Sequence, residues 1–245
     1  LFYYDNNLKS LLNILKLANL WKVKSFVFSS SCTVYGETSE LPVHEDLPFL
    51  PTNSPYGRSK QMCEQIIFDH YTSPNSSGKA ISLRYFNPAG AHSSHLIGES
   101  PINAPLNLVP VITETAIGKR NGFIIYGDDY PTRDGTCIRD YIHVMDLARA
   151  HTLALENILN NHQVQKIECY NLGIGEGVSV LEAIKAFESC TKIKLNYTIG
   201  PRRPGDLSAM YADNSKVKSK LKWSPTFNIQ AIMNDAWIWE TKRNL

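Results

Sequence analysis

The 245-residue sequence predicts an α/β fold built on a parallel sheet. Helical and β-rich patterns alternate over the first 86 residues, and parallel strands need helical crossovers of this kind. With 43% apolar and 20% charged residues, the composition is that of a globular protein. The net charge of +2 gives no electrostatic reason to expect nucleic acid as a partner. No apolar stretch reaches the roughly 18–20 residues of a membrane helix, so no membrane is expected either.

The elements of the first half follow from the spacing of apolar residues. They repeat at helical spacing over 5–22, which indicates an amphipathic helix. The runs 25–30 and 80–86 are short and β-rich, and they indicate buried strands. A second helix is expected over 56–71, because Pro55 stands at its start, where a missing N–H costs nothing.

The second half is less regular. Asp146 is expected to cap a helix over 146–159, and residues 179–182 (Ser-Val-Leu-Glu) form a capping box. Further helices are expected near 107–118 and over 180–190 and 229–241, strands at 123–126, 167–172 and 195–199, and long loops at 36–55 and 87–105. Loops of that length are uncommon in compact domains unless they bind something.

Cysteine usage and the absence of a visible signal peptide both favour a cytoplasmic protein. The five cysteines are odd in number, and none forms a CxxC pair. His92 and His95 have ligand-like spacing but no accompanying carboxylate or cysteine cluster, so no metal is expected. Residues 173–177 (Gly-Ile-Gly-Glu-Gly) resemble a dinucleotide-binding turn, but the third glycine comes one residue early, and we interpret them as a tight turn.

The pair Tyr56 and Lys60 carries the most chemistry. Residues four apart lie on one face of a helix, so a phenol and an ammonium are presented side by side. At about 5 Å and an effective dielectric of about 20, the ammonium favours tyrosinate by roughly 3 kcal/mol, at most about two pKa units. Such a pair can move a proton on and off an alcohol. In isolation, a chance meeting of two surface side chains would be the better explanation of this spacing, because the motif alone is weak.

The context of this pair resembles the short-chain dehydrogenase/reductase superfamily. The serine-rich segment 29–36 follows the strand 25–30, at the end where parallel sheets place ligands, and Tyr56 comes about 25 residues later. Further motifs are similar to the extended branch that acts on nucleotide sugars, and specifically to the UDP-galactose 4-epimerase family. These motifs are residues 84–92 (Arg-Tyr-Phe-Asn-Pro-Ala-Gly-Ala-His), 97–99 (Ile-Gly-Glu), 126–130 (Tyr-Gly-Asp-Asp-Tyr), 134–136 (Asp-Gly-Thr), 139–144 (Arg-Asp-Tyr-Ile-His-Val) and 202–206 (Arg-Arg-Pro-Gly-Asp).

The resemblance implies a Rossmann-like, doubly wound sheet that is incomplete at its N-terminus, with a smaller α/β substrate domain. Residues 1–88 would be the C-terminal half of the NAD-binding domain, and 89–245 mainly a UDP-sugar domain, with about 140–172 packing back on the sheet. The glycine-rich turn of the family is absent and the chain starts at Leu1, so about 90 residues are expected to be missing. The fragment alone is then expected to bind NAD poorly and be inactive, and the complete protein to be an active epimerase.

The resemblance also implies a reaction, the interconversion of UDP-glucose and UDP-galactose by transient oxidation at sugar carbon 4 with tightly bound NAD. Tyr56 would take the proton from that hydroxyl, Ser31 would hydrogen-bond it, and Lys60 would tune Tyr56. The expected cofactor contacts are Asn6, Ser31, Tyr56, Lys60 and Phe86. The expected substrate contacts are Ser31, Tyr56, Tyr85, Asn87, Asn107, Leu108, Ile124, Tyr126, Arg139, Arg203, Asp206 and Met210. Forked guanidinium groups suit a diphosphate, and a carboxylate suits ribose hydroxyls.

Departures from the family pattern leave alternatives open. Leu106 replaces one of two adjacent asparagines, so the amide contact rests on Asn107. The size of Met210 leaves open whether N-acetylated sugars are accepted. A nucleotide-sugar 4,6-dehydratase would need an acidic pair where Cys32 and Thr33 stand. A non-catalytic dimerisation fragment is a further alternative, because helices 5–22 and 56–71 resemble the pair that forms the family's homodimer.

Overall fold

The structure is a computed structural model that describes residues 1–243. It divides into two compact units. The first unit holds residues 1–85, 149–172 and 213–223, and the second holds residues 86–148, 173–212 and those from 224 onward. The chain therefore leaves the first unit at Tyr85 and returns to it twice.

The first unit is a three-stranded parallel sheet covered by helices, in the strand order β1-β2-β7. Ser31, the last residue of β1, pairs with Tyr85, the last residue of β2, so both strands end at the same edge. The elements are α1 (Phe2–Leu20), β1 (Ser25–Ser31), the 3₁₀ helix η1 (Cys32–Tyr35), α2 (Pro55–Thr72), β2 (Lys79–Tyr85), the later part of α4 (Val144–Leu159), β7 (Ile167–Leu172) and α6 (Ser215–Leu221). This arrangement confirms the predicted α/β class.

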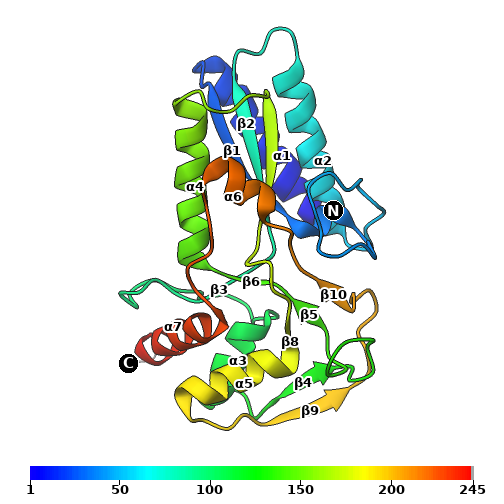
Figure 1. Ribbon diagram of the computed structural model, residues 1–245, viewed down its shortest axis with the longest axis vertical. Helices are drawn as coiled ribbons and strands as arrows, with labels where there is room; N and C mark the ends of the chain where they lie inside the picture. Colours follow the sequence, from blue (N-terminus) through cyan, green and yellow to red (C-terminus); the bar gives the residue numbers. More distant parts are fainter. Residues whose placement is uncertain (244–245) are drawn as a thin grey trace. The chain divides into compact units, whose positions relative to one another are not determined.

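Helices α1 and α2 pack together against one face of this sheet (Figure 1). Their buried side chains form one apolar cluster with residues of the strands: Leu11, Leu15, Cys63, Ile67, Tyr71 and Ala80. In α1 these are the positions that repeat every four residues, which is why the apolar spacing predicted the helix. The packing holds α2, which carries Tyr56 and Lys60, firmly beside the strands.

The second unit combines short strands with three helices. Its elements are β3 (Asn87–Ala89), α3 (Leu108–Ala116), β4 (Phe123–Tyr126), β5 (Ile138–Arg139), β6 (Tyr141–His143), β8 (Val178–Ser179), α5 (Val180–Thr191), β9 (Tyr197–Gly200), β10 (Ala209–Met210) and α7 (Ile229–Lys242). The strands pair as β10-β5-β8, β3-β6 and β4-β9. Helices α3, α5 and α7 meet in an apolar core around Ile112, Phe187 and Ile232.

Most predicted elements are present, and one local prediction is wrong. The capping box forms, since the Ser179 hydroxyl accepts from Glu182 N and the Glu182 carboxylate accepts from Ser179 N. Asp146, however, is not an N-cap, because α4 already begins at Val144. Its carboxylate instead accepts hydrogen bonds from the Thr226 and Phe227 backbone at 2.8 and 3.0 Å, which fixes the segment that leads into α7. No helix among residues 1–243 is long and apolar enough to cross a membrane.

Candidate active-site residues

The carboxyl end of β1 forms a polar turn around Ser31. The strand ends at Ser31, which becomes the N-cap of η1: its Oγ accepts from Thr33 N at 3.3 Å and from Thr33 Oγ1 at 3.0 Å. Ser31 is almost fully buried, with 7% of its surface exposed. A hydroxyl fixed in this way at the strand end can donate to a ligand or to a neighbouring side chain.

Helix α2 brings Tyr56 and Lys60 to this turn. It starts sharply, because the Ser54 hydroxyl accepts from Gly57 N at 3.0 Å and Pro55 occupies the first turn. The Tyr56 phenol lies close enough to the Ser31 hydroxyl for that group to lower the pKa of Tyr56. Lys60 Nζ lies 5.7 Å from the centre of the Tyr56 ring. The structure thus brings together the three residues that the sequence placed in catalysis.

The electrostatics of the pair differ from the sequence-based expectation. Burial raises the pKa of Tyr56 above its ordinary value of 10, and the hydrogen bond from Ser31 only partly opposes this rise. Lys60 directs its ammonium to the Ser29 carbonyl at 2.8 Å, and burial lowers the pKa of Lys60. The expectation of a net lowered Tyr56 pKa is therefore wrong for this structure, since loss of hydration outweighs the lowering effect of Ser31.

Two further tyrosines surround Tyr56. Tyr85, at the end of β2, donates to Ser29 Oγ at 2.7 Å and contacts His151 Nε2. Burial raises the pKa of Tyr85 to about 12, so its hydroxyl stays protonated as a donor. The ring of Tyr3 meets the Tyr56 ring edge-on at 5.7 Å. Sequence reasoning missed Tyr3 and His151, because neither belongs to a motif and both come close only through the tertiary fold.

The next two residues to consider are the predicted cofactor residues Asn6 and Phe86. Asn6 is exposed, and its amide donates to the Phe2 carbonyl of its own helix at 3.0 Å. The neighbouring Asn7 makes the longer-range contact, donating to Ser59 Oγ on α2 at 2.7 Å. Phe86 is buried, with 5% exposed. Asn6 thus has an amide oxygen on the surface of α1, whereas Asn7 is engaged with α2.

In the second unit, two arginines converge on one carboxylate. Arg139 Nη2 lies 3.4 Å from Asp206 Oδ1, and Arg203 Nε lies 3.0 Å from Asp206 Oδ2. Arg139 also donates through Nη1 to the carbonyls of Ile138 and Leu207, both at 2.8 Å. Arg139 is therefore held in place, while Arg203 keeps a half-exposed guanidinium.

A flat apolar surface adjoins these arginines. Burial alternates along β4, so Ile124 and Tyr126 share its exposed face. The Arg203 guanidinium lies over the Tyr126 ring at 4.8 Å. Met210, in β10, is buried and pairs in register with Arg139 of β5. A planar ring could lie on this face with anionic groups directed to the guanidinium groups.

The remaining predicted amides and their neighbour frame the same unit. Asn87 belongs to β3, and its backbone N–H donates to the Asp140 carbonyl at 2.9 Å. Asn107 occupies the N-cap position of α3, just before Leu108, but its side chain makes no capping bond. Its amide instead donates to Glu99 Oε1 at 3.3 Å.

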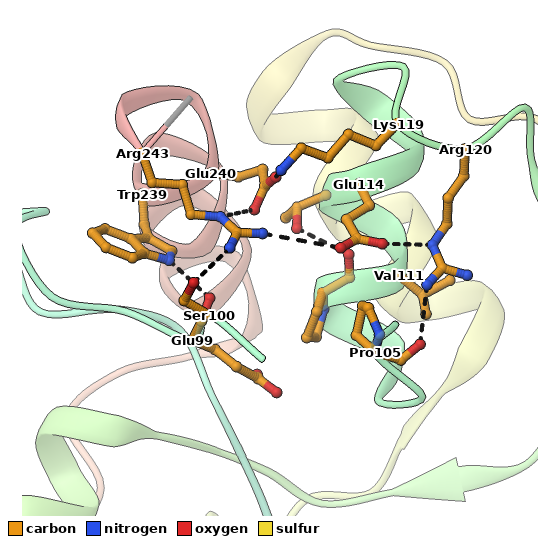
Figure 2. Close-up of polar contacts among 12 residues, drawn as sticks. Glu99, Ser100, Pro105, Val111, Glu114, Lys119, Arg120, Trp239, Glu240 and Arg243 are labelled. Atoms are coloured by element: carbon orange, nitrogen blue, oxygen red, sulfur yellow. Dashed lines mark hydrogen bonds and ion pairs between the residues drawn. The ribbon is translucent and has the colours of Figure 1, made fainter. Parts of the chain in front are cut away.

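The loop that leads to Asn107 is fastened to helix α7 (Figure 2). The Trp239 indole N–H donates to the Glu99 carbonyl at 2.9 Å. The Trp239 ring also lies directly on Gly98, where a Cβ atom would be 2.4 Å from the ring carbon Cγ. Only glycine permits this approach, so Gly98 and Trp239 together set where Glu99, and with it Asn107, can lie.

Two arginines, both paired with Glu114, hold the rest of the loop by hydrogen bonds (Figure 2). Arg243 Nη1 donates to Ser100 Oγ at 2.9 Å, and Arg120 Nη2 donates to the Pro105 carbonyl at 3.1 Å. The Glu114 carboxylate lies between the two guanidinium groups, 2.6 Å from Arg120 Nε and 4.0 Å from Arg243 Nη2. The segment before Asn107 is thus tied to both α3 and α7.

Comparison with known proteins places these features in a family. The family model described as GDP-mannose 4,6 dehydratase matches residues 1–236. UDP-glucose 4-epimerase of Erwinia amylovora is 46% identical over 240 residues, covering 98% of this chain and 70% of the relative.

Two solved structures are closely similar. UDP-glucose 4-epimerase of Bifidobacterium longum, in complex with NAD+ and UDP, is 45% identical with a TM-score of 0.92. The enzyme of Stenotrophomonas maltophila, with NAD and formylated UDP-arabinopyranose, is 40% identical with a TM-score of 0.94. Each match covers 98% of this chain and 70% of the other. The chain therefore belongs to the extended short-chain dehydrogenase/reductases and, within them, to the UDP-glucose 4-epimerase family.

Proposed function

We propose that this protein interconverts UDP-glucose and UDP-galactose by transient oxidation at sugar carbon 4, with NAD as tightly bound cofactor. The observation that carries the proposal is the cluster of Ser31, Tyr56 and Lys60 at the carboxyl end of β1. An alcohol that lies against Tyr56 can pass its proton to the phenol oxygen, while Ser31 donates a hydrogen bond that favours the oxyanion. The related epimerases solved with NAD and with UDP support the same chemistry.

The donor set at this edge fits the ribose and nicotinamide end of NAD. Lys60 uses one hydrogen bond on Ser29, so its ammonium retains donors for ribose hydroxyls. NAD, when bound, supplies the acceptor and donor of hydride. The protein's own residues hold the alcohol, move its proton at Tyr56 Oη and keep Lys60 charged beside it. Phe86, Asn6 and Tyr85 are the further candidates for contacts with cofactor or substrate.

The second unit supplies the groups that suit UDP. Arg139 and Arg203 match a diphosphate, and Asp206 can accept from ribose hydroxyls when an arginine turns to phosphate. Ile124 and Tyr126 offer the exposed apolar face for the uracil ring. The amides of Asn87 and Asn107, beside Leu108, complete the proposed contacts, and Met210 is proposed to border the sugar.

The homodimer and the compartment are also proposals. Helices α1 and α2 carry exposed apolar side chains, among them Leu12, Ile14, Leu17 and Phe68, and a second copy could cover them. We propose this face as the interface of a homodimer. None of the five cysteines, all of which lie within residues 1–243, forms a disulfide, which is typical of a reducing compartment such as the cytoplasm.

The test uses protein expressed from its complete coding sequence. UDP-galactose is supplied, and the nucleotide sugars are separated by chromatography after incubation; UDP-glucose should form, and bound NAD should be released on denaturation. Tyr56→Phe should lower turnover by about 10²–10⁴-fold, as expected for loss of a general acid–base group. A 4-keto-6-deoxy product would favour a dehydratase instead, although Cys32 and Thr33 stand where its acidic pair is expected. Bound NAD without turnover would refute the proposal, and UDP-N-acetylhexosamine in the same assay would settle the role of Met210.

A further inference from the structure

A buried ion pair in the first unit joins β2 to α2, the helix that carries Tyr56 and Lys60. Arg84, on β2, binds the Glu64 carboxylate of α2 in a two-pronged manner, with Nε at 3.0 Å from Oε1 and Nη2 at 2.7 Å from Oε2. Arg84 is 5% exposed and Glu64 9%. Burial alone would lower the pKa of Arg84, but the hydrogen bonds and charge of Glu64 raise it, so the guanidinium stays charged.

Stability alone does not account for such a pair. Removing two charges from water costs several kcal/mol per ion, and apolar residues of similar volume often give an equally stable or more stable protein. The pair must satisfy most of its hydrogen-bonding capacity to be tolerated at this depth. The other hydrogen-bond partners of Arg84 and Glu64 therefore show which parts of the fold the ion pair holds in place.

Two of those partners belong to the elements that carry Ser31, and a third is the Glu45 carbonyl, which accepts from Arg84 Nη1 at 3.2 Å. Ser30 Oγ donates to Glu64 Oε1 at 2.5 Å, so the carboxylate holds the residue that directly precedes Ser31. On the other side, Arg84 Nη1 donates to Tyr35 Oη at 2.9 Å, and Tyr35 is the last residue of η1, the turn that Ser31 caps. The ion pair is thus hydrogen-bonded to the chain on both sides of Ser31, at Ser30 and at Tyr35.

The same carboxylate is rigidly connected to Tyr56. Glu64 lies on α2 one turn after Lys60 and two turns after Tyr56, within a single helix of 18 residues. At 1.5 Å per residue, Tyr56 is about 12 Å away along the helix axis. A displacement of Glu64 relative to Ser30 would therefore shift the Tyr56 phenol relative to the Ser31 hydroxyl.

We propose that Arg84, Glu64 and Ser30 are positioning residues that set where the Ser31 hydroxyl lies relative to the Tyr56 phenol. They do not touch the substrate, and they act through Ser31. The inference rests on the proposed epimerase function. Catalytic groups that are misplaced by about 1 Å can lose on the order of 100-fold in rate, so a positioning contact of this kind has a measurable signature.

The experiment measures kcat, KM and NAD content of the complete, NAD-loaded protein and of three variants. Glu64→Gln removes the charge, Arg84→Lys removes the two-pronged geometry, and Ser30→Ala removes one hydroxyl while leaving the ion pair intact. We expect kcat to fall about 10–100-fold for the first two variants and about 3–10-fold for the third. KM and NAD content should stay within about twofold of the wild type.

A double-mutant cycle with Ser31→Ala separates positioning from a general structural role. If Glu64 acts through Ser31, then Glu64→Gln should lower kcat by less than about threefold in the Ser31→Ala background. The matched control is Glu240→Gln, because Glu240 is itself only 2% exposed and also forms ion pairs, with Lys119 and Arg243 at 2.9 and 2.7 Å. This control should lower the melting temperature while kcat stays within about twofold.

The outcomes distinguish a positioning role of Glu64 from a purely structural role. Equal losses of kcat from Glu64→Gln in both backgrounds would overturn the positioning role. Unchanged kcat in Ser30→Ala and Glu64→Gln, with only melting temperature reduced, would overturn it as well. Absence of turnover in the wild-type protein would instead refute the proposed function itself.

Discussion

Replacing Lys60 by methionine tests whether the ammonium assists ionisation of Tyr56. Lys60 Nζ lies 5.7 Å from the centre of the Tyr56 ring. At an effective dielectric of about 20, a unit charge at that separation favours the tyrosinate by about 3 kcal/mol, which corresponds to about two pKa units or 100-fold in ionised fraction. Because burial already raises the Tyr56 pKa, the tyrosinate is a minor species at neutral pH and its fraction grows tenfold per pH unit.

The assay is the pH dependence of UDP-galactose turnover between pH 7 and 9. Turnover of the wild type should rise with pH, and Lys60→Met should lower it by up to about 100-fold at each pH, whereas Lys60→Arg keeps the charge and should lose much less. Bound NAD is measured in each variant, so that loss of cofactor is separated from loss of ionisation. Lys60→Met turnover within about threefold of wild type, with NAD still bound, would contradict the electrostatic argument, and so would equal losses in both variants.

Three further perturbations probe other parts of the structure. Gly173→Ala places a Cβ atom 2.3 Å from Asp140 Oδ2, a carboxylate held by three backbone N–H groups, so the melting temperature should fall by about 4–10 °C; a change below 1 °C would contradict this. Burial acts to raise the pKa of Asp134, but its hydrogen bonds lower it overall, so its contribution is present above about pH 4 and is lost as pH falls through the folded-state pKa. Asp134→Asn should therefore lower the unfolding free energy by about 1–2 kcal/mol at pH 7, and urea titrations should show the difference shrinking as the pH falls below about 4. Trp239→Phe removes the donor to the Glu99 carbonyl and should raise KM for UDP-galactose about fivefold at constant kcat; an unchanged KM would show that this bond does not position the loop.

Local sequence signals predicted the elements that depend on local physics. The start of α2 is determined by Ser54 and Pro55, and the start of α5 by the capping box at 179–182. The strands at 123–126 and 167–172 have the predicted bounds; the first is a continuous β-favouring run, and the second contains Glu168 and Asn171 among β-favouring residues. That Tyr56 and Lys60 share one face also follows from the helix alone, because they are four residues apart.

Elements that depend on distant partners had no comparable signal. Strands β3, β5, β6, β8 and β10 are two or three residues long, and only tertiary pairing makes them strands. Helix α6 reads as a lysine-rich polar segment, since within its seven residues only Val217 and Leu221 are buried. The return of residues 213–223 to the first unit was likewise not visible in the sequence.

In the candidate site, too, local patterns were predictable from the sequence and distant contacts were not. The motifs predicted that Ser31, Tyr56 and Lys60 belong together, but the contacts of Ser30 with Glu64 and of Tyr3 with Tyr56 join residues 34 or more positions apart. The sign of the Tyr56 pKa shift also required the structure, because burial, and not the cation, dominates it. From the spacing of the two residues one can estimate the attraction between the Lys60 ammonium and a Tyr56 phenolate, but not the loss of hydration that raises the Tyr56 pKa.

The second unit shows how a site for an anion can be partly preorganised. The Arg139 side chain is 20% exposed and is fixed by two backbone carbonyls, whereas the Arg203 side chain is 52% exposed and contacts the Asp206 carboxylate and the face of the Tyr126 ring. A diphosphate that displaces Asp206 from Arg203 would therefore meet one guanidinium already in place and one that must turn. The ordering of a single exposed side chain costs about 0.5–1.5 kcal/mol, and a two-pronged contact with phosphate exceeds that cost. The carboxylate left behind then faces the ligand with free lone pairs, which is the arrangement that a ribose hydroxyl would satisfy, so the ion pair and the proposed nucleotide contacts are two states of the same three residues.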